Sequence, residues 1–377
     1  MKRRPRFIFI FGTRPEIIKL APLIKLCQKR RVFFKMIHSG QHYSYDMDRV
    51  FFRDLQLPLP NYSLRIKSKA PYMQGNHTGR MLIEIEEILL EELPFAVIVQ
   101  GDTNTALAGA LCAEKISTTR DYTGFQINVA HVEAGLRSWD RSMPEEVNRF
   151  LVDHLSDFLF VPTALEKKIV TKEGVPASHI YVTGNTIVDA VQAHIKLSQR
   201  RRGLLEHLGI EQSRYALLTL HRQENVDSPL RFRSILQGIV LVAKRLKMPI
   251  IFPIHPRTVK ALERFGIKPP RPIKMITPLD FLSFLYLESY ASLILTDSGG
   301  VQEEACILKV PCVTLRENTE RPQTVKVGSN IVGGVRPQNI LAAAMEMVDK
   351  RRVWRNPFGD GKASQKMFDI LWKASRG

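Results

Sequence analysis

A short apolar run, followed each time by a turn and a helical period, recurs along the chain and constrains the fold more than any other feature. In the first half the runs span residues 7–11, 95–100, 127–132 and 158–161, and in the second half residues 215–220, 249–254, 291–296 and 310–315. Strands that are apolar at nearly every position and alternate with helices are typical of parallel sheets covered on both faces. The pattern therefore predicts an α/β protein with doubly wound sheets.

The length of the chain predicts two such domains. The chain has 377 residues, and single cores stop growing at roughly 250–300 residues. Residues 180–183 have a strand pattern, residues 184–186 a turn pattern and residues 187–198 a helical period. We therefore place the boundary at residue 185, with one domain over residues 1–185 and a second over residues 186–361.

Composition and charge weigh against several classes of function. The net charge of +18 comes from 55 basic and 37 acidic residues, but the basic clusters at residues 2–6, 200–202 and 351–352 are short. They carry no interleaved aromatic residues on which bases could stack, so we expect no specific nucleic-acid binding. A positive field would also favour an anionic substrate.

Membrane and redox signals are weak. The apolar run at residues 7–11 is shorter than the roughly 7–15 residues of a secretory signal, and no run approaches the roughly 20 residues of a membrane span. We therefore expect a cytoplasmic chain without membrane insertion. The cysteines form no CxxC pair, so we expect neither disulfides nor a zinc site; they are Cys27, Cys112, Cys306 and Cys312.

Ligands of open parallel sheets bind beyond the carboxyl ends of the strands, and the first such segment is residues 12–19. Thr13 and Glu16 have capping-box spacing, which indicates a helix start. A helix N-terminus attracts anions, and Arg14 and Lys19 would add positive charge. The segment is therefore either a phosphate site or a plain helix start with two solvated cations.

Three acidic residues of the first half follow, or lie close to, strand ends. Asp102 and Glu133 come directly after apolar runs, and Glu145 falls in the first turn of a predicted helix. Each one alone is explained by a turn, a cap or the helix dipole. Together they could converge on one site, as carboxylates do where protons are transferred.

The second half offers a candidate phosphate site at residues 297–300. Gly299 and Gly300 open a helix after a strand, and their lack of side chains would let backbone N–H groups approach a phosphate. His221 follows another strand, whereas we expect His255 to have a structural role. No GxGxxG motif follows a strand, so the sequence does not support a bound nicotinamide.

Ten ordered segments of the chain resemble one enzyme family. They are FGTRPEIIKLAP (11–22), GQHY (40–43), QGDTNTALAGAL (100–111), AHVEAGLRS (130–138), MPEEVNR (143–149), VTGNTIVDA (182–190), LTLHRQEN (218–225), LTDSGGVQEEA (295–305), ENTERP (317–322) and NPFGDGKAS (356–364). The order and spread of these segments are similar to those of the non-hydrolysing UDP-N-acetylglucosamine 2-epimerases.

The resemblance implies a fold and an activity. It implies the glycosyltransferase-B architecture, in which two Rossmann-like doubly wound domains face a cleft, with the helix over residues 362–377 packing back on the first domain. It further implies a homodimer without cofactor or metal. The implied reaction interconverts UDP-N-acetylglucosamine and UDP-N-acetylmannosamine by elimination and re-addition of UDP through 2-acetamidoglucal, in a pathway to surface polysaccharide.

The resemblance also implies roles for individual residues. Asp102, Glu133 and Glu145 would be the acid/base carboxylates of the first domain. His221 would bind the diphosphate and assist the leaving group. The remaining contacts would hold the UDP-sugar, namely Arg14, Lys19 and Arg321 on the phosphate side, Ser298, Gly299 and Gly300 on a phosphate, Glu304 on the ribose and Phe284 near the uracil.

The chain departs from the family pattern at three places. Leu279 stands where some members have glutamine, and residues 43–46 and the loop at 75–79 also differ. The last two departures weigh against allosteric activation by UDP-N-acetylglucosamine. Epimerisation of a modified UDP-2-acetamido sugar, a hydrolysing epimerase and a glycosyltransferase on the same fold stay open as alternatives.

Overall fold

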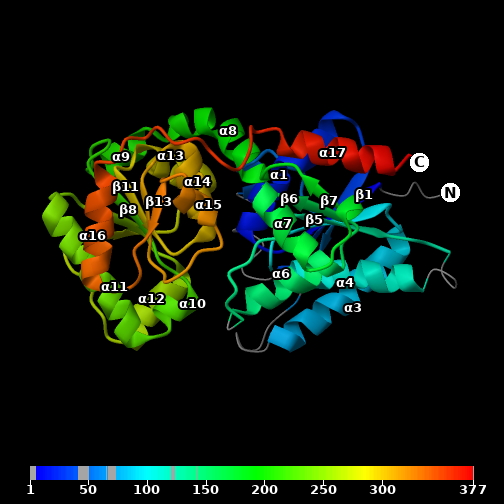
Figure 1. Cartoon of the computed structure of the whole chain (residues 1–377), viewed down its shortest axis with the longest axis horizontal. Helices are drawn as coiled ribbons and strands as arrows, with labels where there is room; N and C mark the ends of the chain where they lie inside the picture. The colour runs from blue at the N-terminus through cyan, green and yellow to red at the C-terminus, as the bar shows by residue number, and fades with distance from the viewer. Residues whose placement is uncertain are drawn as a thin grey trace. The chain divides into compact units, whose positions relative to one another are not determined.

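The computed structural model describes residues 6–40, 51–64, 66, 74–119, 124–141 and 143–376, and Figure 1 shows its ribbon. Residues 41–43 of the family-like segment GQHY, the departure from the family pattern at residues 43–46 and residues 2–5 of the first basic cluster lie outside this described part. The chain divides into unit 1, Met1–Ala190 with Phe358–Gly377, and unit 2, Val191–Pro357. Among the described residues, no helix is long and apolar enough to cross a membrane.

Unit 1 is built on a seven-stranded sheet with the order β3-β2-β1-β4-β5-β6-β7. All its described neighbouring strands pair in parallel. The strands are β1 (Phe7–Phe11), β2 (Phe34–His38), β3 (Tyr62–Ser63), β4 (Ala96–Gln100), β5 (Asn128–Val132), β6 (Phe158–Val161) and β7 (Ile180–Val182). The chain order reverses between β1 and β4, the switch point at which ligands bind in such sheets.

Helices cover both faces of this sheet because its central strands are buried on both sides. β1 and β4 have no exposed residue. The helices are α1 (Arg14–Lys29), α3 (Gln74–Glu92), α4 (Asn104–Thr118), α6 (Pro144–His154), α7 (Ala164–Lys172) and α17 (Ala363–Ala374). A further helix, α8 (Thr186–Ser198), begins in unit 1 and ends in unit 2. One apolar core joins α3 and α4 to the sheet, with Met81 and Ile85 of α3 against Ile8 and Val99.

The segment at residues 75–79, which the sequence analysis treats as a loop, is instead part of α3. The glycines there would each cost up to about 1 kcal/mol against alanine, but packing outweighs propensity. His77, Met81, Ile85 and Leu89 form one buried face at helical spacing. Tertiary burial of that face, rather than local preference, stabilises the helix.

The C-terminal helix α17 belongs to unit 1 and packs on α1 (Figure 1). Met367, Phe368 and Leu371 are its buried apolar residues. The first turn of α17 is fastened to the start of α8, since the backbone N–H groups of Ala363 and Ser364 donate to Asp189 at 3.2 and 2.9 Å. Both apolar packing and hydrogen bonds therefore hold α17 on unit 1.

Unit 2 contains a six-stranded sheet with the order β10-β9-β8-β11-β12-β13. Its described neighbouring strands are parallel as well. The strands are β8 (Ala216–Thr219), β9 (Ile250–Pro253), β10 (Ile273–Ile276), β11 (Leu293–Thr296), β12 (Cys312–Thr314) and β13 (Asn330–Val332). The switch point lies between β8 and β11.

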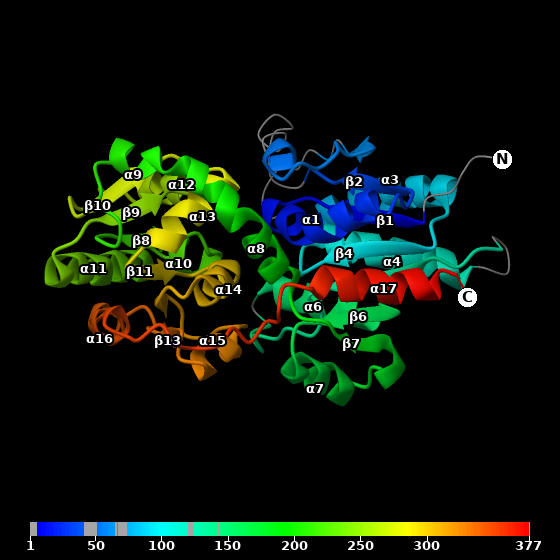
Figure 2. The same ribbon diagram turned by 90° about the horizontal axis from the view of Figure 1, so that it is seen from above.

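The helices of unit 2 also flank both faces of the sheet. They are α9 (Gly203–His207), α10 (Gln223–Val226), α11 (Pro229–Leu246), α12 (Pro256–Arg264), α13 (Phe281–Tyr290), α14 (Gly299–Leu308), α15 (Pro322–Lys326) and α16 (Pro337–Val348). Figures 1 and 2 show α11 and α16 side by side. Two apolar cores, one against α11 and α16 and one against α13 and α14, account for the buried strands.

Candidate active site

Glu133 stands directly after β5 in a backbone conformation that few residues adopt. Its φ is +70°, in the left-handed region that is uncommon for residues with a side chain. The backbone N–H groups of Glu133 and Ala134 both donate to the Phe160 carbonyl, at 3.1 and 3.2 Å. Non-glycine residues held in such conformations cluster at functional sites.

The side chain of Glu133 is buried and partnered by a cation. It accepts from the Lys19 ammonium and, at 2.6 Å, from the Gln100 amide. Lys19 is itself buried in α1. The structure thus brings Lys19, expected at the phosphates, to the carboxylate of Glu133, where it balances the buried negative charge.

Asp102 lies at the end of β4, after a turn in which Gly101 has a φ of +70°. Its Oδ2 accepts from the Arg149 guanidinium at 2.5 Å, and the Asp102 side chain stays 30% exposed while Arg149 is buried. The same guanidinium donates to Glu146 at 2.6 Å. Asp102 is therefore fixed in place and still open to solvent, which a group that exchanges protons with a substrate requires.

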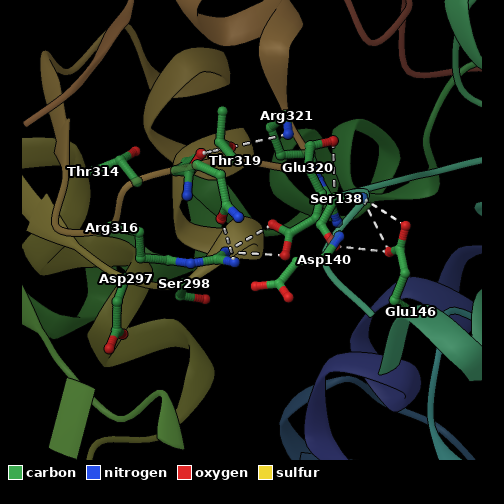
Figure 3. A network of polar contacts seen from close by, with 12 residues as sticks. Ser138, Asp140, Glu146, Asp297, Ser298, Thr314, Arg316, Thr319, Glu320 and Arg321 are labelled. Carbon is green, nitrogen blue, oxygen red and sulfur yellow. Dashed lines mark hydrogen bonds and ion pairs between the residues drawn. The ribbon is translucent and has the colours of Figure 1, made fainter. Parts of the chain in front are cut away.

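Glu145 and Glu146 of α6 have different surroundings. Glu145 is half-buried in the first turn of the helix, whereas Glu146 is buried. Glu146 accepts from the backbone N–H group of Ser138 at 3.0 Å (Figure 3). It also accepts from the backbone N–H group of Trp139 at 2.9 Å. Burial alone would raise the pKa of Glu146, but these N–H groups and Arg149 lower it. Glu146 thus fastens the loop before α6, a role that the sequence analysis did not assign.

Glu16 is a buried carboxyl that joins the loops after β1 and β4. It accepts from the Thr13 hydroxyl at 2.7 Å and from the Thr103 hydroxyl at 2.8 Å. The capping box predicted from spacing forms in part only, because the Thr13 side chain makes no capping hydrogen bond. Burial raises the pKa of Glu16 to about 7, and hydrogen bonds from Thr13, Thr103 and Gly12 oppose the shift.

Arg14 lies at the first residue of α1, half-buried, with its guanidinium carbon 4.6 Å from the centre of the Phe51 ring. An arginine over an aromatic face is held by a cation–π contact. Its charge therefore stays at the N-terminus of α1, close in sequence to Glu16.

In unit 2, Asp297 organises the segment after β8. It is fully buried and accepts from the backbone N–H groups of His221 and Arg222, at 3.0 and 2.8 Å, and from the Asn225 amide at 3.1 Å. The His221 ring nitrogen Nδ1 lies 3.6 Å from Asp297. Burial lowers the pKa of His221, although Asp297 opposes the shift. The His221 imidazole is thus oriented by a carboxylate.

His255, for which we expect a structural role, caps the helix that follows it. Its Nδ1 accepts from the Arg257 backbone N–H at 3.1 Å and so caps α12. The ring lies 5.4 Å from that of His221.

The start of α14 leaves backbone N–H groups available. Ser298 precedes the helix, and its hydroxyl makes no capping hydrogen bond. A Cβ added at Gly300 would meet only the Ser298 hydroxyl, at 3.9 Å. The first N–H groups of a helix have no partner within it, so this end of α14 has the geometry of an anion site.

The loop that follows β12 contains two buried arginines, Arg316 and Arg321. Arg321 pairs with Glu303 at 2.5 Å, and a Cβ added at Gly299 would lie 3.5 Å from its guanidinium carbon. Arg316, which the sequence analysis missed, pairs with Glu320 at 2.9 Å and with Glu224 at 3.1 Å. Figure 3 shows Arg316, Glu320 and Arg321 together. Arg321 thus lies beside the N-terminus of α14, as a phosphate-side residue would.

Two carboxyls meet between α13 and α14. Glu304 is buried on α14 and Glu288 is fully buried on α13. Burial raises the pKa of Glu288 well above its usual range, and the Glu304 carboxyl adds to the shift. Phe284, on α13, is half-buried, as is Leu279 before that helix. No sequence pattern marked Glu288 as a candidate site residue, because it lies inside a mostly apolar helix and not at the end of a strand.

The described part of the chain contains no group of three His, Cys, Asp or Glu side chains that could hold a metal ion. All four cysteines are free and buried. Burial raises the pKa of Cys27 and of Cys112 to about 12, so neither thiol is reactive at neutral pH.

Two doubly wound parallel sheets, each with polar side chains gathered at strand ends beside its switch point, define a protein of the glycosyltransferase-B class. The predicted fold class is confirmed. The family model for UDP-N-acetylglucosamine 2-epimerase matches residues 25–372. The chain belongs to the UDP-N-acetylglucosamine 2-epimerase family, a family of isomerases.

Individual relatives agree over nearly the whole chain. A UDP-N-acetylglucosamine 2-epimerase of Methanocaldococcus jannaschii is 50% identical over 96% of this chain and 97% of its own. The crystal structure of the M. jannaschii enzyme in complex with UDP-GlcNAc and UDP matches 97% of this chain and 99% of its own, with a TM-score of 0.90. A UDP-2,3-diacetamido-2,3-dideoxy-D-glucuronate 2-epimerase of Pseudomonas aeruginosa is 36% identical over 98% of this chain and 99% of its own.

Proposed function

We propose that the chain catalyses the reversible C2 epimerisation of UDP-N-acetylglucosamine to UDP-N-acetylmannosamine through 2-acetamidoglucal. The observation that carries the proposal is the pair of carboxylates at adjoining strand ends of unit 1. Asp102 is fixed by an arginine and open to solvent, and Glu133 is paired with Lys19. The 50% identical relative named for this activity supports the choice of substrate.

The chemistry requires a leaving group because the C2–H of the sugar is not beside a carbonyl. In the forward step the C2–H and C1–O bonds break, and a C1=C2 double bond forms. The proton passes to a carboxylate, and UDP leaves with the electron pair of the C1–O bond. UDP then adds back to C1 while a proton is delivered to the other face of C2, and the scheme needs no cofactor.

The carboxylates of unit 1 fit the proton transfers of this scheme. Two faces of C2 need a base and an acid, and Asp102 and Glu133 are our leading pair, with Glu145 as the third acid/base group. Each positioned group of this kind contributes about 10²–10⁴-fold to the rate. The Lys19 ammonium, paired with Glu133, would hold this carboxylate in place.

The strand ends of unit 2 would hold UDP as it leaves. His221 would bind the diphosphate and assist departure, and the N-terminus of α14 with Arg321 would bind phosphate oxygens through Ser298, Gly299 and Gly300. Donors aimed at developing charge are worth about 3–4 kcal/mol each. Glu304 would take the ribose hydroxyls, Phe284 would lie near the uracil, and Arg14 of unit 1 would add positive charge on the phosphate side.

Incubation of the protein with UDP-N-acetylglucosamine in deuterated water tests the proposal. We expect deuterium at C2 of both sugars, detected by NMR, together with UDP-N-acetylmannosamine and a trace of 2-acetamidoglucal. Inversion without solvent label, or release of free sugar, would contradict the elimination route.

A second candidate substrate is a UDP-sugar with a further acetamido group and a carboxylate. The P. aeruginosa relative named for such a sugar is 36% identical to this chain. The same deuterium experiment with UDP-2,3-diacetamido-2,3-dideoxy-D-glucuronate separates the two. A kcat/KM at least about tenfold higher for one sugar, some 1.4 kcal/mol of discrimination, would identify it as the substrate.

We further infer that the chain is a homodimer. An exposed apolar stripe runs along α6, where Val147, Phe150 and Leu151 are 41%, 46% and 41% exposed. Ile83 and Leu90 of α3 are also exposed, at 63% and 46%. Contiguous apolar surface of this kind marks association, and a second copy of the chain presents the same stripe, as a symmetric interface requires.

A further inference from the structure

The two strands at the switch point of unit 1 separate from each other before they end. β1 and β4 pair with each other only as far as Phe9 and Ile98. On their outer sides the same strands stay paired to their last residues, β1 with β2 and β4 with β5. Among these described residues, the sheet therefore does not join the end of β1 to the end of β4, which Asp102 follows.

The helices that follow β1 and β4 do not share a core either. α4 packs on the face of β1 that carries Ile8 and Ile10, and a Cβ added at Gly109 of α4 would lie 3.1 Å from Ile10 Cδ1. α1, all of which the structure describes, contributes no residue to that core. Chains diverge in this way at the switch point of a doubly wound sheet. A fixed distance between the two loops therefore needs a side chain that reaches from one to the other.

Glu16 supplies this link, with one carboxyl oxygen for each loop. Its Oε2 accepts from the Gly12 backbone N–H at 3.1 Å and from the Thr13 hydroxyl at 2.7 Å, both on the β1 side. Its Oε1 accepts from the Thr103 hydroxyl at 2.8 Å, on the β4 side, across 87 positions of the chain. Glu16 is 1% exposed, so water competes little for these hydrogen bonds.

The Thr103 hydroxyl is held from two directions. Its oxygen accepts from the Ala106 backbone N–H at 3.0 Å, as the N-cap of α4, while its single proton is donated to Glu16. Thr103 directly follows Asp102, whose side chain accepts from Arg149 of α6 at 2.5 Å. Asp102 thus lies between a contact from α6 and a contact from α1.

We propose that Glu16 is a positioning residue that sets the place of Asp102 by fastening the end of β4 to the end of β1 through Thr103. The proposal rests on the proposed role of Asp102 in proton transfer at C2. Misplacement of a catalytic group by about 1 Å costs roughly 10²-fold in rate. A link at the residue after Asp102 therefore acts on turnover, whereas the proposed UDP contacts of unit 2 do not depend on it.

The N-terminus of α7 provides a matched control. Thr163 accepts from the Leu165 backbone N–H at 3.2 Å and donates to Glu166 at 2.5 Å. Thr103 and Thr163 thus make the same kinds of hydrogen bond, but Glu166 lies only three positions from its threonine, on the same helix. Thr163→Val therefore removes a helix cap and a glutamate partner without touching the link between the two loops.

The hydroxyl is tested by the kinetics of UDP-N-acetylglucosamine epimerisation in deuterated water. Thr103→Val keeps the shape of the side chain and removes both hydrogen bonds, whereas Thr103→Ser keeps the hydroxyl. We expect Thr103→Val to lower kcat and exchange at C2 at least about tenfold, with KM within about twofold of wild type. Thr103→Ser should restore the wild-type kcat. Thr163→Val should lose stability with its cap and keep its kcat, and equal kcat in the two valine variants would overturn the proposal.

Glu16 is tested by a double-mutant cycle with Thr103. Glu16→Met removes the acceptor, whereas the amide of Glu16→Gln can still accept from Thr13 and donate to Thr103. If Glu16 and Thr103 act through one hydrogen bond, Glu16→Met should lower kcat at least about tenfold, and adding Thr103→Val should lower it no further. Glu16→Gln should retain most of the wild-type kcat. Losses that multiply in the double variant would overturn the proposal, and if Glu16→Met does not fold, the Thr103 variants decide.

The positioning role and the proposed function fail in different ways. Exchange at C2 in the wild type, together with an unchanged kcat in Thr103→Val, refutes the positioning role alone. A wild type that lacks exchange at C2 refutes the proposed function, and with it the role given to Glu16.

Discussion

At the scale of the residue, the chemistry of unit 1 depends on two turns with a positive φ. Gly101 and Glu133 both have a φ of +70°. Glycine adopts this conformation without penalty, whereas Glu133 is held in it by hydrogen bonds to Phe160. The backbone of the neighbouring strand thus sets the direction of the Glu133 side chain.

Asp102→Asn and Glu133→Gln test the carboxylates. We expect either change to lower turnover at least 100-fold, within the range of a lost acid/base group, because amides cannot exchange the proton of C2. UDP affinity, measured by calorimetry, should stay within about twofold, since all the proposed UDP contacts except Arg14 are on unit 2. Near-normal turnover in both variants would remove these residues from the mechanism.

Glu16 predicts a pH dependence of stability. Its folded pKa is raised from 4.5 to about 7, so between these values the folded chain binds more protons at this site than the unfolded chain. The free energy of unfolding should therefore fall as pH rises through this window, by roughly 3 kcal/mol from this group. The stabilising contribution is complete below about pH 4.5 and is lost above about pH 7.

Glu16→Gln should remove this slope, because an amide can accept from Thr13, donate to Thr103 and not titrate. Chemical denaturation at a series of pH values measures it, and Glu87→Gln, at an exposed glutamate of α3, is the control. An unchanged slope in Glu16→Gln would show that another group carries the dependence.

At the scale of the element, a substitution at the start of α14 should change UDP binding without reducing the stability of the fold. A Cβ at Gly300 meets no atom closer than 3.9 Å, and alanine is favoured over glycine in a helix by roughly 0.5–1 kcal/mol. Gly300→Ala should therefore fold at least as stably as wild type. Its methyl group would stand where a phosphate approaches the N–H groups.

We expect Gly300→Ala to weaken UDP binding at least about tenfold, or some 1.4 kcal/mol, in calorimetry, with an unchanged or higher melting temperature. Gly203→Ala at the start of α9, where a Cβ also meets open space, should leave affinity unchanged. Equal affinity in the two variants would argue against phosphate at α14.

Strands buried on both faces could be predicted from the sequence. The run at residues 7–11 is β1 itself, and the run at residues 95–100 contains β4. The strands β2 and β10 were not predicted, because Lys35 and Lys274 interrupt their apolar patterns. Lys35 lies in the sheet because its ammonium reaches Glu92 at 2.6 Å, a partner 57 positions along the chain.

The same limit applies to the candidate site. Asp102 and Glu133 could be predicted because each follows a strand, and position in a parallel sheet is a local property. The partners that set their chemistry come from elsewhere, as Lys19 does for Glu133 over 114 positions and Arg149 for Asp102 over 47. No local pattern in the sequence encodes such pairings, so they could not be predicted.

At the scale of the whole molecule, the apolar stripe of α6 predicts the oligomeric state. Val147→Glu with Leu151→Glu places two charges on that stripe and leaves Phe150, which lies near Arg137, unchanged. Because a buried charge opposes association, we expect the double variant to be a monomer by light scattering where the wild type is a dimer. Leu230→Glu, at a residue that is 82% exposed on α11, should remain a dimer.

The return of α17 to unit 1 has a consequence during translation. The strands of unit 1 emerge from the ribosome first, yet α1 stays without its cover until residue 374 has been made. Unit 2 is continuous in sequence and can fold as it appears. Unit 1 is thus synthesised first and completed last. Nascent chains stalled shortly before residue 363 should therefore expose the α1 surface to proteases and chaperones.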